Sequence, residues 1–144
     1  MKKDKSSILV SIFKRKGGEG QYTKILNDSI DKKYSDLLSS QLTNNEKGLL
    51  IYYLDSSHWF ILTDLRVINN NDMYFNIIEN INIKKVSLAI EEEFKDGVRN
   101  KKDFTRLLIT DHENQNHLLE LEKGSPYEGI YQVLHFLANQ TARI

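Results

Sequence analysis

Cysteine is absent from this chain of 144 residues, and proline occurs only once. Without cysteine the protein has no disulfides, no thiolate zinc site and no cysteine nucleophile. An excess of charge of one sign is also missing, because 20 basic side chains balance 20 acidic ones. This balance argues against a protein held on nucleic acid by bulk charge. The 40% hydrophobic and 28% charged residues, in the length of one ordinary domain, predict a globular fold.

Long hydrophobic runs are absent too, since no segment approaches the ~20 apolar residues of a membrane helix. Residues 1–16 combine six basic groups with a short apolar stretch at residues 8–13, but no small-residue cleavage site follows it. Two interpretations of this segment stay open. We favour a short element that packs on the domain and ends at Gly17 and Gly18, over a weak interfacial anchor on anionic lipid. We expect a cytoplasmic protein.

Apolar residues recur at helical spacing near both ends of the chain. In residues 20–42 this spacing predicts an amphipathic helix. Near the C-terminus, Ser125 and Glu128 form a capping box around Pro126, which predicts a helix over residues 126–139. We therefore divide the chain into an N-terminal extension, residues 1–42, whose amphipathic helix packs on the domain, and a main domain, residues 43–144.

Between these helices, seven short stretches rich in β-branched, aromatic and aliphatic residues are separated by turn signals. They are residues 49–54, 58–63, 65–68, 74–78, 81–90, 104–110 and 117–121. This spacing predicts an antiparallel barrel or sandwich, and hence a mainly β protein with flanking helices, of the α+β class. In the second stretch, Trp59 and Ile61 share one face while Phe60 and Leu62 share the other. Such a strand needs cover on both faces, and the N-terminal helix is the natural outer cover.

Two phrases of the sequence resemble the bacterial pleckstrin-homology-like (PH-like) domain family. Residues 41–50 place Glu46 shortly before the first strand, and residues 58–68 carry the pattern aromatic-x-x-Leu-Thr-x-x-Arg-hydrophobic-Ile, which includes Thr63 and Arg66. The resemblance extends over roughly residues 42–140. It implies a PH-like barrel of about seven antiparallel strands closed by the C-terminal helix. It implies no particular ligand, because this scaffold hosts lipid, peptide and protein partners.

No pattern of residues predicts catalysis. Asp55, Ser57 and His58 are neighbours in one turn, and adjacency of this kind does not build a catalytic triad. His112 and His117 lie five residues apart in a polar loop, not the four that place two metal ligands on one helical face. We therefore predict that the protein is not an enzyme and has no cofactor and no metal site.

Charge is distributed unevenly along the chain, with a net +4 in residues 1–48 and a net −4 in residues 49–144. Glu91, Glu92 and Glu93 lie at the end of a predicted strand and form an acidic edge that can attract a basic partner. The alternative for these glutamates is a solvated strand end that prevents edge-to-edge aggregation.

These observations favour a non-enzymatic binding module, a small cytoplasmic bacterial protein that binds another protein and not nucleic acid. The specific hypothesis is an antitoxin-like immunity protein that neutralises a cognate toxin. Contacts are expected at strand edges, at the three glutamates or in the groove between the last strand and the closing helix. The alternative is a peripheral membrane module that binds phospholipid headgroups. Its basic residues would be Lys2, Lys3, Lys5, Lys14, Arg15, Lys16, Arg99, Lys101 and Lys102.

Overall fold

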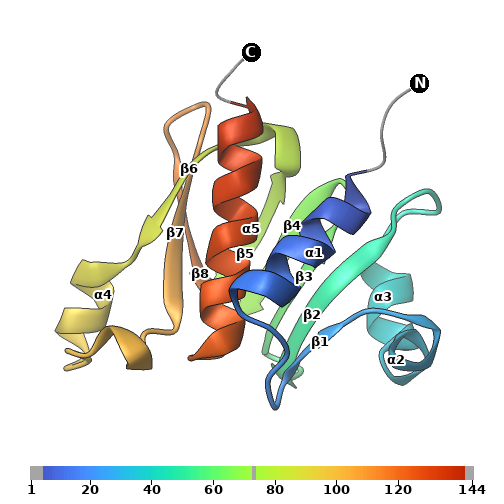
Figure 1. The fold of residues 1–144 in the computed structure, drawn as a ribbon, viewed down its shortest axis with the longest axis horizontal. Coiled ribbons are helices and arrows are strands. Elements are labelled where there is room, and N and C mark those ends of the chain that lie inside the picture. The colour runs from blue at the N-terminus through green and yellow to red at the C-terminus, as the bar shows by residue number, and fades with distance from the viewer. Residues whose placement is uncertain (1–4, 73, 142–144) are drawn as a thin grey trace.

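The computed structural model describes residues 5–72 and 74–141, which form helices and antiparallel strands in the order shown in Figure 1. The elements are α1 (Ser6–Lys16), β1 (Thr23–Ile25), α2 (Asp28–Lys33), α3 (Ser35–Gln41), β2 (Gly48–Asp55), β3 (His58–Thr63), β4 (Arg66–Asn71), β5 (Tyr74–Glu79), the 3-10 helix η1 (Asn80–Asn82), β6 (Ile83–Leu88), α4 (Ile90–Lys95), the 3-10 helix η2 (Lys101–Asp103), β7 (Arg106–Asp111), β8 (Asn116–Glu120) and α5 (Ser125–Thr141).

The strands form two antiparallel sheets, one of five strands in the order β1-β2-β3-β4-β5 and one of three in the order β6-β7-β8. The predicted α+β class, the antiparallel pairing and the C-terminal helix are thus confirmed. The predicted closed barrel is wrong, because in the described residues no strand ladder joins the two sheets. Between the sheets, η1 is held at the β3–β4 turn, where the Asn80 N–H donates to the Leu65 carbonyl (2.8 Å). Where β5 approaches β8, the contact is a side-chain bond from Asn76 Nδ2 to the Leu118 carbonyl (2.9 Å).

The predicted helix over residues 20–42 is only partly correct. Residues 23–25 are the strand β1, which pairs with β2, and the remainder is divided into α2 and α3 at Tyr34. Helix α2 begins after Asn27 because the Asn27 side chain accepts hydrogen bonds from the main-chain N–H groups of Ser29 and Ile30. Residues 23–41 therefore contribute an edge strand to the five-stranded sheet and two short helices that pack on it.

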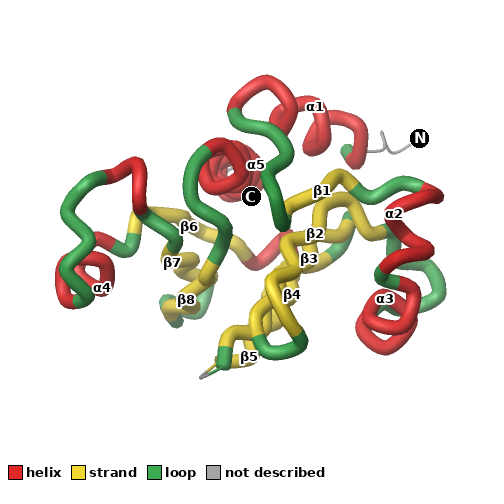
Figure 2. The backbone as a smooth tube through the Cα atoms, turned by 90° about the horizontal axis from the view of Figure 1, so that it is seen from below, coloured by secondary structure: helices red, strands yellow, loops and turns green. Residues whose placement is uncertain are grey.

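The five-stranded sheet is covered on both faces, as Figure 2 shows, with α2 and α3 on one side and α5 on the other. The outer face has a cluster of four buried side chains, Ile51, Trp59, Ile61 and Ile68. Apolar side chains from the segment 26–42 pack against this cluster. On the inner face, Phe60 and Leu62 join the main core with α5 and the smaller sheet. Strand β3 is thus apolar on both faces and covered on both.

Helix α1 packs across α5 through a close contact. Leu9, Ile12 and Phe13 are buried, and a Cβ atom at Gly129 of α5 would lie 2.7 Å from the Phe13 ring. Glycine at this position therefore permits the crossing. The apolar side of α1 is consequently occupied by the rest of the fold.

Candidate binding surface on the five-stranded sheet

Two large apolar side chains are left uncovered on the outer face of β5, an edge strand of the five-stranded sheet. Phe75 and Ile77 point to the outer face and are 53% and 47% exposed, whereas Ile78, which points inward, is 2% exposed. We call Phe75 and Ile77 the β5 strip. The Phe75 ring makes an edge contact with Trp59, with ring centroids 6.1 Å apart. Exposed apolar residues gathered on one sheet face are typical of interaction surfaces.

The strip is bare because the helices of the outer face do not reach it. Residues of α2, α3 and their connections pack on Ile51, Trp59, Ile61 and Ile68, which belong to β2, β3 and β4. In the register of the sheet, Ile68 lies opposite Ile77 on the neighbouring strand. The limit of the helical cover therefore runs between β4 and β5.

A pocket of about 340 Å³ lies at the end of the strip. Three segments form it, namely the α3–β2 connection, the β3–β4 turn and the end of β5 with η1. Its lining residues are Thr43, Glu46, Asp64, Leu65, Arg66, Glu79, Asn80 and Ile81. Since Ile77 and Glu79 are two residues apart on one strand, they share a face at a spacing of about 7 Å. The strip and this acidic pocket are therefore one continuous surface.

A network centred on Glu46 builds one wall of the pocket. Arg66 donates from Nε to Glu46 Oε2 (2.9 Å) and from Nη2 to Glu46 Oε1 (2.7 Å), and Thr63 Oγ1 donates to Oε2 (2.6 Å). Arg66 Nη2 also donates to the Gln41 carbonyl (2.7 Å) at the end of α3. The network thus ties α3, the start of β2 and the β3–β4 turn together.

The protonation of Glu46 follows from this network. Burial alone would raise the pKa of Glu46, but the hydrogen bonds from Arg66, Thr63 and the Thr43 N–H outweigh burial and lower it to about 2. A buried carboxylate of this kind is charged at neutral pH and is compensated by Arg66. Glu46, Thr63 and Arg66 are the polar residues of the two sequence phrases, and sequence reasoning did not predict that they meet.

Asp64, Glu79 and Asn80 keep unused acceptor capacity in the same pocket. The Asp64 carboxylate accepts a hydrogen bond from the Lys47 N–H (2.9 Å). Asn80 is 6% exposed and donates from Nδ2 to the Thr63 carbonyl (3.1 Å), but its Oδ1 has no hydrogen-bond partner within the described residues. A buried acceptor without a donor is uncommon in folded proteins.

The three glutamates selected from the sequence lie on α4, so the prediction that they end a strand is wrong. Glu93 is 1% exposed, and its Oε2 accepts hydrogen bonds from the N–H groups of Thr105 (2.6 Å) and Arg106 (3.1 Å). This carboxylate is used inside the fold, where it fixes α4 to the start of β7. Glu91 is exposed and Glu92 is half-buried, and partner binding by these two stays a prediction.

Two of the four histidines form local pairs with acids. His58 Nδ1 lies 2.9 Å from Asp55 Oδ1, and His117 Nε2 lies 2.9 Å from Asp111 Oδ2. The hydrogen bond with Asp55 raises the pKa of His58, and the bond with His117 lowers the pKa of Asp111. The two pairs belong to different hairpins, and His58 contacts Asp55 and not the Ser57 hydroxyl. Across residues 5–72 and 74–141, no group of three or more acidic or histidine side chains is placed to hold a metal ion.

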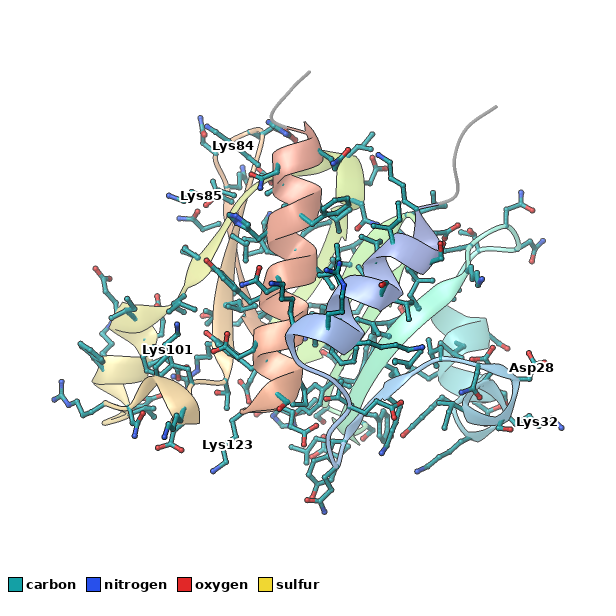
Figure 3. The ribbon with its side chains drawn as sticks, in the orientation of Figure 1. Asp28, Lys32, Lys84, Lys85, Lys101 and Lys123 are labelled. Carbon is teal, nitrogen blue, oxygen red and sulfur yellow. The ribbon has the colours of Figure 1, made fainter. Side chains whose placement is uncertain are left out.

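Basic side chains are spread over separate parts of the surface. Lys14, Arg15 and Lys16 are exposed at the end of α1, and Figure 3 shows Lys32 on the opposite side of the molecule from Lys101. Lys2 and Lys3 lie outside the described residues. None of the helices in the described part of the chain is long and apolar enough to cross a membrane.

Comparison with protein families, with curated proteins and with solved structures found no match for this chain.

Proposed function

We propose that this chain is a non-enzymatic binding module of PH-like type, which binds another protein through the β5 strip and the adjoining acidic pocket. The observation that carries this proposal is the half-exposed pair Phe75 and Ile77 on the outward face of an edge strand. Burying such side chains fully stabilises a contact by roughly 1.5–3 kcal/mol each. Because these side chains are about half exposed in the free protein, about half of this free energy would be gained only when a partner covers them.

The PH-like part of the proposal is supported by the order of elements. Strands β2 to β5 form an antiparallel meander, β6 to β8 form a second one, and α5 follows. This order agrees with the family that the two sequence phrases resemble. Strand β1 adds a further edge strand next to β2.

Within this class, we propose a cytoplasmic immunity protein whose partner is a toxin domain. A toxin inhibitor of this kind needs a binding surface and no chemistry of its own. If a toxin gene adjoins the gene for this chain, co-expression of the two proteins tests the proposal directly. Growth should be restored by the wild-type chain, and the purified proteins should elute as one complex. Failure of the wild-type chain to restore growth or to form the complex would refute the toxin proposal.

The surface itself is tested with two matched double variants. Phe75→Ser/Ile77→Ser removes the β5 strip, while Ile90→Ser/Phe94→Ser removes two apolar side chains of similar exposure on α4. Affinity capture from native lysate, read by mass spectrometry, should recover a partner with the wild type and the α4 variant and not with the strip variant. Equal recovery by all three proteins would refute the assignment of the surface.

A membrane-binding function makes a different prediction. If the proposed function is correct, the protein should stay in the supernatant when vesicles of phosphatidylcholine and phosphatidylserine are sedimented. Salt-sensitive co-sedimentation that is lost on replacing Lys14, Arg15 and Lys16 by alanine would favour the membrane alternative. The apolar residues Leu9, Ile12 and Phe13 are buried in the fold and are not presented for insertion into lipid.

A further inference from the structure

We propose that the acidic pocket receives a cationic side chain, a lysine or an arginine, from the protein that docks on the β5 strip. This inference rests on the proposed function and deepens it by naming the chemistry of the partner's anchor. Three carboxylates and one guanidinium line the pocket, namely Glu46, Asp64, Glu79 and Arg66. Glu46 and Arg66 bond to each other, so the pocket as a whole carries an excess of negative charge.

The free hydrogen-bonding groups of the pocket are acceptors. Asp64 uses one of its carboxylate oxygens on the Lys47 N–H. Glu79 is exposed and faces Arg66 across the β4–β5 ladder. The Asn80 Oδ1 is buried and without a donor in the described part of the chain. A ligand that fits these groups must supply several donors and positive charge, as ammonium and guanidinium groups do.

The apolar part of the lining fits the rest of such a side chain. Leu65 is 50% and Ile81 is 71% exposed, and both line the pocket together with the acceptors. Lysine and arginine bury their methylene stems on apolar surface while their charged ends reach polar groups. A partner residue that enters beside Ile77 would place its stem between Leu65 and Ile81 and its charge among the acceptors.

The continuity of the surface selects a protein as the source of the cation. The apolar β5 strip and the acidic pocket are joined through Ile77 and Glu79 on one strand, so one partner surface with an apolar patch beside a basic residue matches both. Electrostatic complementarity of this kind sets register and specificity more than total affinity. The pocket would therefore select among partners that the strip alone would accept.

The proposal is tested by NMR titration of the full chain with N-acetyl-arginine amide, N-acetyl-lysine amide and the neutral isostere N-acetyl-citrulline amide. The two cationic probes should give saturable shifts at the amides of residues 64–66 and 79–81. Citrulline should bind about tenfold more weakly, as expected for the loss of a charge-assisted hydrogen bond. Equal binding of citrulline, or the absence of shifts at these amides, would overturn the proposal.

Two variants separate the pocket from the strip. Asp64→Asn/Glu79→Gln should weaken binding of the arginine probe about tenfold, whereas Asp28→Asn/Asp36→Asn, a matched neutralisation of two exposed carboxylates on α2 and α3, should bind it like the wild type. Partner capture then distinguishes the two proposals. If the pocket variant binds the captured partner as tightly as the wild type while the strip variant does not, this inference fails and the proposed function stands. If the strip variant retains the partner, the proposed surface fails, although the probe result is unaffected.

Discussion

The outer face of the five-stranded sheet has two halves. Both present apolar side chains, but helices cover only one of them. Over β2 to β4, Ile51, Ile61 and Ile68 are fully buried beneath α2 and α3. On β5, Ile77 lies directly opposite Ile68 and is 47% exposed. Neighbouring isoleucines on one face therefore belong to different environments. The covered half contributes to the stability of the free protein, whereas the exposed half leaves apolar side chains available to a binding partner.

The strongest test of this comparison is a truncation in the covered half. Ile61→Ala should lower the free energy of unfolding by about 3 kcal/mol, because it removes a fully buried side chain and leaves a cavity. Urea unfolding followed by circular dichroism measures this change. A loss below about 1 kcal/mol would mean that α2 and α3 do not pack on the sheet as described.

The network at the boundary between the halves gives the next largest effect. Glu46→Gln should lower the free energy of unfolding by roughly 3 kcal/mol, because Arg66 would remain without its buried charged partner. The control is Glu79→Gln, which removes an exposed carboxylate on the other side of the pocket and should leave stability almost unchanged. Equal losses in the two variants would contradict the structural role of Glu46.

The same carboxylate makes stability depend on pH. The pKa of Glu46 is lowered to about 2 in the folded protein from an ordinary value of 4.5. Its contribution is therefore fully present above about pH 4.5 and is lost as the pH falls toward about 2. Urea unfolding at pH 7, 4 and 3 should show a smaller acid loss in Glu46→Gln than in the wild type. Identical pH profiles would show that other groups control acid unfolding.

The smallest effect is expected in the bare half. Ile77→Ala should lower the free energy of unfolding by less than about 1 kcal/mol, because half of this side chain is already in water. The same urea experiment as for Ile61→Ala provides the measurement, and the two variants delete identical atoms. A loss as large as that of Ile61→Ala would place Ile77 in the core and remove the basis of the proposed surface.

The sequence predicts the local elements of this fold better than their long-range arrangement. Turn signals locate strands β2 to β8, and alternation assigns Trp59 and Phe60 to opposite faces. The helical spacing in residues 20–26 gave a wrong prediction because residues 23–25 pair as a strand with β2, where Ile25 lies opposite Leu50, so a tertiary contact outweighed the helical pattern. The helix in residues 90–95 was missed because its carboxylate Glu93 is satisfied by main-chain groups at residues 105 and 106, which are distant in sequence.

The candidate surface was less accessible to sequence reasoning than the fold. Ile77 and Ile78 are adjacent and both apolar, so the pattern does not reveal which of them is covered. The meeting of Glu46 with Arg66 joins residues 20 positions apart, which is a matter of sheet register. Both residues belong to the two phrases that resemble the PH-like family, but nothing in those phrases indicates that Glu46 and Arg66 are in contact.

The crossing of α1 over α5 also restricts where a guest molecule can sit. Since Gly129 lets the Phe13 ring approach the α5 backbone, α1 itself covers this side of α5. A partner molecule therefore cannot bind there without displacing α1. On the opposite face of the five-stranded sheet, α2 and α3 cover β2 to β4 and leave β5 exposed. The outer face therefore offers a partner uncovered apolar side chains, and they lie on β5.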